Sequence, residues 1–65
     1  MTIEQQERTV KELLEELRAR RWSDADIGRE IGVTYVAVWR WRKGKQHPPM
    51  EKLVKRALME LLERP

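Results

Sequence analysis

Apolar residues recur every three or four positions along most of the chain, which is the spacing of one face of an α-helix. In residues 3–20 the repeating positions are Ile3, Val10, Leu13, Leu14 and Leu17. The alternation typical of a β-strand is absent except in residues 34–38, where a capping threonine and the short distance between two glycines favour a helix instead. The pattern therefore predicts an all-α protein whose first helix covers residues 3–20.

A second, shorter helix is predicted over residues 24–31, where two isoleucines lie four positions apart. Ser23 precedes two acidic residues and is expected to cap this helix, because acids favour the positive end of the helix dipole. Gly32 is expected to end it, since glycine adopts the left-handed conformation at little cost. Trp22, just before the cap, is expected to fill the core between the first two helices.

A third helix is predicted over residues 34–43, between Thr34 as its cap and Gly44 as its end. Val38 and Trp41 lie three positions apart, so they share one side of this helix and are expected to point into the protein. The two tryptophans of the segment then have opposite environments, because Trp39 falls on the outward side.

The last helix is predicted over residues 49–63, after a segment that two prolines keep from being helical. Pro49 suits the first position of a helix, since the N–H that it lacks would have no partner there. The four helices are expected to form one compact domain, residues 1–65.

Apolar residues cover about half of the circumference of this last helix, more than the stripe of a little over 100° that a one-sided surface helix needs. The surplus edge is expected to be exposed in a single chain and to be the interface of a homodimer. It consists of Leu58, Met59 and Leu62. The alternative is that a further helix or tail of a longer protein covers the same edge.

Positive charge is concentrated in one part of the chain, although the net charge is only +3. Residues 31–50 contain no acid, and their four cations account for all of the excess positive charge. These are Arg40, Arg42, Lys43 and Lys45. Such a segment suits contact with a polyanion, but a solvated basic loop explains the charge equally well.

Few residues of the chain are candidates for catalysis or for metal binding. The chain has no cysteine and one histidine, His47, which is expected to be a loop residue. No catalytic constellation, metal site, cofactor site or small-molecule site is expected, and the protein is not expected to be an enzyme. No apolar run is long enough to span a membrane and no signal peptide is recognisable, so a cytoplasmic location is expected.

Two short helices joined by a turn containing glycine form a helix-turn-helix unit. Gly28 lies where the two helices cross and a small residue is needed, and Gly32 makes the turn. Over about residues 13–60, the sequence resembles the DNA-binding domains of the Cro and lambda-repressor (XRE-type) family. The segment GVTYVAVWRWRKGKQHP carries the resemblance, through Gly32, Val38, Trp41, Gly44, Lys45 and Pro48.

The chain departs from that family at three places. Asp24 replaces a glutamine that helps to bind phosphate, and we expect it to cap the helix instead. Arg21 replaces a glycine, so the first helix is expected to end differently. The family's fifth helix is not recognisable.

The resemblance implies that the outward residues of helix 34–43 enter the major groove of double-stranded DNA. The base-reading candidates are Thr34, Tyr35, Val36 and Arg40. Arg40 is the foremost of them, because its planar fork can bond guanine O6 and N7 together. The candidates for the DNA backbone are Ser23, Trp39, Lys43, Lys45, Gln46, Arg20 and Arg21. For Trp39, contact with a second subunit is an equal alternative.

The expected function is sequence-specific binding of double-stranded DNA, as a dimer on a two-fold operator, by a small prokaryotic or phage repressor. The same fold would also serve in a phage packaging, recombination or transposition complex. A third alternative is a protein-interaction module that no longer binds DNA.

Overall fold

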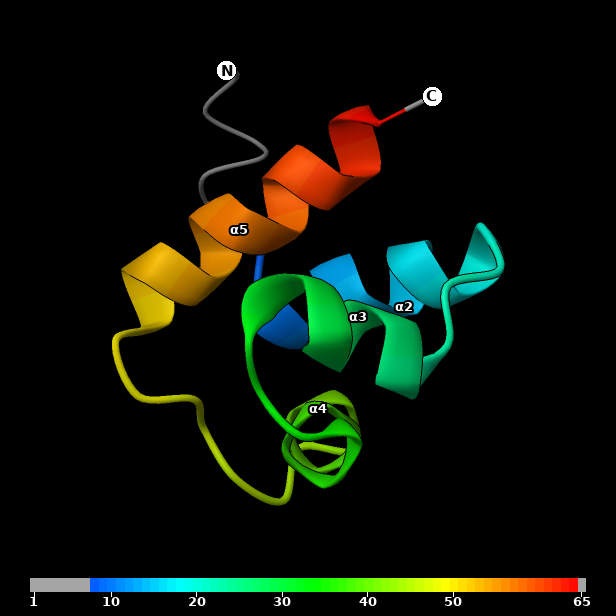
Figure 1. Cartoon of the computed structure of the whole chain (residues 1–65). Coiled ribbons are helices and arrows are strands. Elements are labelled where there is room, and N and C mark those ends of the chain that lie inside the picture. The colour runs from blue at the N-terminus through cyan, green and yellow to red at the C-terminus, as the bar shows by residue number, and fades with distance from the viewer. Residues whose placement is uncertain (1–7, 65) are drawn as a thin grey trace.

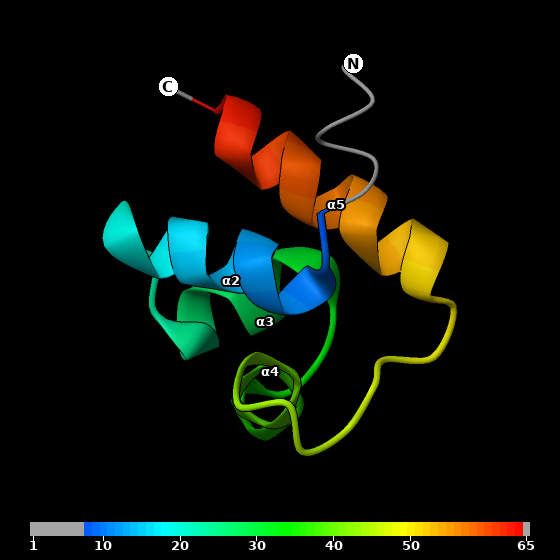
Figure 2. The same cartoon turned by 180° about the vertical axis from the view of Figure 1, so that it is seen from behind.

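The computed structural model describes residues 8–64, and over this range the chain forms four α-helices and no strand. The helices are α2 (Val10–Ala19), α3 (Asp24–Ile31), α4 (Tyr35–Arg42) and α5 (Glu51–Glu63). In Figure 1, α5 crosses one side of the α2–α3 pair and α4 lies on the opposite side, and Figure 2 shows the same order from behind. The predicted all-α class with four helices is confirmed. No helix within this range has the length and apolar character that a membrane span requires.

Helix α2 begins at Val10, later than predicted, because Thr9 is its N-cap. The Thr9 backbone is extended, and its hydroxyl accepts a hydrogen bond from Glu12 N at 3.1 Å. The Glu12 carboxylate in turn accepts one from Thr9 N at 3.2 Å, which completes a capping box. A continuous helix through Thr9 was therefore a wrong prediction. Residues 3–7 of the predicted helix lie outside the described residues.

The end of α2 contradicts the expectation that Arg21 changes how this helix stops. Arg21 itself adopts the left-handed conformation, with φ 74°. Trp22 N donates to Leu17 O at 3.0 Å and Arg21 N donates to Arg18 O at 2.9 Å. This is the Schellman pattern that normally ends in glycine. Arg21 thus adopts the left-handed backbone conformation that glycine usually adopts at this position.

The turn between α3 and α4 forms as predicted. Gly32 has φ 84°, a left-handed conformation that few other residues adopt. A Cβ atom on Gly28 would lie 2.6 Å from the carbonyl oxygen of Val33, so the close approach of the turn to α3 requires glycine there. Thr34 caps α4 by accepting a hydrogen bond from Ala37 N at 3.2 Å. The predicted roles of Gly28, Gly32 and Thr34 are confirmed.

The core lies between α2 and the other three helices. Its buried residues are Val10, Leu13, Leu14, Leu17, Ile27, Val38, Trp41, Leu58, Met59 and Leu61. Val38 and Trp41 are 0% and 5% exposed, as predicted. Trp22 is only half-buried and packs against the edge of this core rather than filling its centre.

Helix α5 buries a different edge from the one predicted. Leu58 and Met59 belong to the core and Leu62 is half-buried, so the prediction that these residues are exposed in a single chain is wrong. The physical reason is that α5 turns this edge toward α2, where Met59 and Leu62 lie beside Leu13. The exposed large apolar residues of this region are Met50 and Leu53, at 70% and 53%.

The start of α5 also differs from the prediction. The helix begins at Glu51, and Pro49 precedes it. Met50 stands in the N-cap position in a left-handed conformation, with φ 52° and ψ 52°, and its side chain makes no capping hydrogen bond. Pro49 therefore limits the chain before the helix without being its first residue.

Candidate nucleic-acid interface

The outward side of α4 carries a continuous stripe of side chains. Val36 lies three positions before Trp39 and four before Arg40, and these two lie four and three positions before Lys43, the C-cap of α4. Residues at these spacings are neighbours on the surface of a helix. We call these four residues the α4 stripe. Val36 and Trp39 are 37% and 38% exposed, and Tyr35, at the first position of the helix, is 62% exposed. Arg40 and Lys43 are also exposed.

The cations of this region are available to a ligand. Within residues 8–64, Arg40, Lys43 and Lys45 take part in no ion pair. Lys45 Nζ lies 5.5 Å from the centroid of the Trp39 ring, which is a cation–π distance. This contact joins the loop after α4 to the stripe and gathers the three positive charges on one surface.

Arg42, the fourth cation of the segment, has a structural role. Its Nε and Nη2 atoms donate to the two carboxylate oxygens of Asp24, at 3.2 and 3.0 Å. The two side chains are only 12% and 14% exposed. These hydrogen bonds are the main reason why the pKa of Arg42 is raised, while burial of the guanidinium opposes the effect.

The ion pair corrects the prediction for Asp24. Ser23, not Asp24, is the N-cap of α3, and its hydroxyl accepts a hydrogen bond from Asp26 N at 3.0 Å. Asp24 instead ties the first turn of α3 to the last turn of α4. A carboxylate that is neutralised in this way repels a phosphate less than a free one. The sequence indicated only that Arg42 is one of the four cations of this segment, because its partner Asp24 lies 18 positions away.

The predicted base-reading residues lie along the same helix, three of them at its N-terminal end and Arg40 in its last turn. Tyr35, Val36 and Arg40 all belong to α4, and Thr34 is its exposed N-cap residue. Lys45 and Gln46, predicted to contact the DNA backbone, are exposed in the loop that follows. The structure thus brings most of the predicted site residues to α4 and its two ends.

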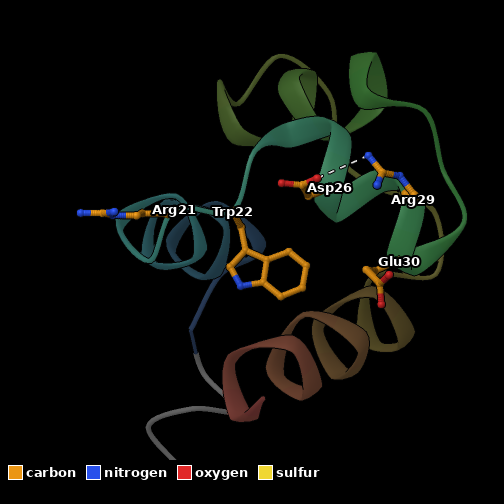
Figure 3. Close-up of a pocket in the computed structure, with 5 residues that line it drawn as sticks. All are labelled: Arg21, Trp22, Asp26, Arg29 and Glu30. Atoms are coloured by element: carbon orange, nitrogen blue, oxygen red, sulfur yellow. Dashed lines mark hydrogen bonds and ion pairs between the residues drawn. The ribbon is translucent and has the colours of Figure 1, made fainter. Parts of the chain in front are cut away.

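Three of the predicted backbone residues lie outside α4 and the loop after it. They are Ser23, the N-cap of α3, and Arg20 and Arg21 at the end of α2. Arg20 donates to the carbonyl oxygen of Leu62 at 2.7 Å and lies 3.7 Å from the carboxylate of Glu16, so it fastens the end of α5 to α2. Arg21 borders an open pocket of about 300 Å³ beside Trp22. Figure 3 shows it extending away from Trp22. These two arginines are not gathered with the α4 stripe.

No protein-family model, curated protein or solved structure matches the chain. Among the described residues, no three histidine, aspartate or glutamate side chains are grouped so that they could hold a metal ion.

Proposed function

We propose that the protein binds double-stranded DNA by placing α4 in the major groove. The observation that carries the proposal is the α4 stripe, an exposed surface with two cations and no acid on a helix whose other side is anchored in the core. An α-helix with its side chains is 10–12 Å wide and the major groove of B-DNA is about 12 Å wide. The width of the helix thus matches that of the groove.

The polar side chains of this surface are suited to two kinds of contact, one with a base and one with the phosphates. Arg40, in the centre of the stripe, is our candidate for guanine, because its fork can donate to O6 and N7 together. Lys43, Lys45 and Gln46 lie at the C-terminal end of α4, where contacts to phosphate oxygens would fix the register of the helix in the groove. The proposed function thus assigns sequence discrimination to Arg40 and most of the affinity to the lysines.

The resemblance to Cro and lambda-repressor domains supports the same proposal and extends it to a transcriptional regulator in the cytoplasm of a prokaryote. The α3–α4 unit, with Gly28 at the crossing and Gly32 in the turn, is the arrangement that this resemblance implies. Selection of bound duplexes from a random pool distinguishes a regulator from a packaging or recombination module, since a palindromic consensus favours the regulator.

Titration with duplex DNA at several salt concentrations tests the proposal. Affinity should fall steeply as salt rises, because each phosphate contact releases counterions. Lys43→Ala should lower the slope of log K against log salt by about 1. The matched control is Arg56→Ala, which removes an exposed cation of α5. Helix α5 lies across the α2–α3 pair from α4 (Figure 1). Affinity without salt dependence, or equal losses in both variants, would contradict binding through α4.

An interaction with another protein is the second candidate, favoured by the apolar part of the surface. Tyr35, Val36 and Trp39 together expose a patch that water covers poorly. A protein partner would be indicated if duplex DNA did not bind while Trp39→Ala abolished association with that partner.

We also propose that two copies act together on a two-fold operator. Since Leu58 and Met59 are buried, the candidate contact moves to Met50 and Leu53, which border an apolar groove of about 240 Å³ with Val33. Sedimentation at increasing concentration should show a dimer, and Leu53→Glu should weaken it while the helix content remains unchanged. A parent protein that sediments as a monomer on its own and on DNA would contradict this part of the proposal.

A further inference from the structure

The outward side of α4 offers hydrogen-bond donors but almost no acceptors. Within Tyr35–Arg42 there is no carboxylate and no side-chain amide, and the hydroxyl of Tyr35 is the single oxygen among the side chains. The neighbouring hydroxyl of Thr34 already accepts a hydrogen bond from Ala37 N. Cytosine presents only an amino group to the major groove and adenine presents an amino group beside one acceptor, whereas guanine presents two acceptors. The surface therefore favours guanine for Arg40.

The apolar part of the stripe has its own counterpart in the groove. The C5 methyl group of thymine is the one apolar group that the bases display in the major groove. Val36 lies one helical turn before Arg40 on the same side of α4 and is 37% exposed. One turn of helix advances 5.4 Å, while successive base pairs are 3.4 Å apart. Side chains separated by one turn thus reach base pairs one or two steps apart.

From this arrangement, and resting on the proposed function, we infer that the site reads a thymine methyl group through Val36 within two base pairs of the guanine bound by Arg40. The methyl group itself, not the hydrogen-bonding edge of thymine, is the feature that Val36 recognises. Uracil differs from thymine only by lacking this methyl group. Replacing the contacted thymine with uracil therefore removes the contact and leaves every hydrogen bond of the duplex unchanged.

The test compares two versions of one duplex. The duplex is first selected from a random pool by the parent protein and then synthesised with either thymine or uracil. One methyl group is worth about as much as a buried methylene, so the parent should bind the uracil duplex roughly fourfold more weakly for each contacted thymine. Val36→Ala should bind the thymine duplex more weakly than the parent does and should bind both duplexes nearly alike. Val36→Thr, which keeps one methyl group, should retain part of the discrimination.

Lys43→Ala is the matched control, because it changes the stripe without touching its apolar part. It should weaken binding to both duplexes equally and keep the parent's ratio between them. The inference is overturned if the parent binds thymine and uracil duplexes equally, or if Val36→Ala keeps the parent's ratio. Both of these results leave salt-dependent binding of DNA intact. Loss of salt-dependent binding to every duplex, by contrast, removes the proposed function itself.

Discussion

Replacing Arg21 with glycine should make the protein more stable. Arg21 ends α2 with φ 74°, and within residues 8–64 it makes no ion pair. A residue with a Cβ atom is disfavoured in the left-handed conformation by about 1–2 kcal/mol, a penalty that glycine does not carry. Part of this gain is lost again, because glycine raises the conformational entropy of the unfolded chain. This favours unfolding by about 0.4–1 kcal/mol.

The difference leaves a net stabilisation of roughly 0.5–1 kcal/mol for Arg21→Gly. In a domain of this size the melting temperature should rise by about 4 °C. Arg21→Ala is the control, since alanine removes the side chain but keeps the backbone penalty, and it should leave the stability nearly unchanged. Gly44 ends α4 in the same way, with φ 75° and open space around the missing Cβ, so Gly44→Ala should destabilise the protein by about 1 kcal/mol.

Thermal and urea unfolding of the four proteins, followed by circular dichroism, give the comparison. The decisive quantity is the difference between glycine and alanine at position 21, because both variants lack the arginine side chain. If Arg21→Gly is no more stable than Arg21→Ala, the left-handed conformation is not what limits the stability of this helix end. The reasoning from φ would then be refuted.

Three further predictions concern the anchoring of the helices. Gly28→Ala should destabilise the fold by about 1–3 kcal/mol in urea unfolding, because its Cβ would lie 2.6 Å from the carbonyl oxygen of Val33. An unchanged unfolding midpoint would show that the backbone of the turn moves to make room for the methyl group. Asp24→Asn should cost about 2 kcal/mol, since it leaves the guanidinium of Arg42 partly buried without its counter-charge, and an equally stable variant would show that the pair is dispensable. The capping hydrogen bonds lower the pKa of Glu12 below its ordinary 4.5 in the folded protein. Their contribution is therefore complete above pH 4.5 and is lost as the pH falls through the lower folded value, so stability measured across this range should fall less steeply in Glu12→Gln than in the parent.

The sequence predicted the central part of the fold well. The bounds of α3 agree with the prediction, and α4 differs from it only at its ends. Gly28, Gly32 and Thr34 have the predicted roles because each acts on neighbouring backbone, which a local pattern can describe. The inward orientation of Val38 and Trp41 followed from their spacing, and it also fixed which side of α4 is exposed.

The errors concern interactions between segments that are distant in the sequence. Asp24 and Arg42 are 18 positions apart, and nothing near either residue indicates that they meet. The apolar circumference of α5 was recognised, but its pattern could not show which edge α2 covers, so Leu58 and Met59 were assigned to the wrong surface. The conformation of Arg21 was not predicted for a different reason. Glycine is preferred at such a helix end, but it is not required there, and the left-handed conformation can be adopted by arginine at a cost.

On α4, the residues that hold the helix and those that form its exposed stripe are different residues. Val38 and Trp41 fix one side in the core and Arg42 fixes the end through its ion pair. Val36 and Arg40 belong neither to the buried core nor to this ion pair. The two sets can therefore change independently of each other. Such a helix is a suitable scaffold for redesign, in which the exposed positions are randomised to obtain new ligand preferences while the folding determinants stay fixed.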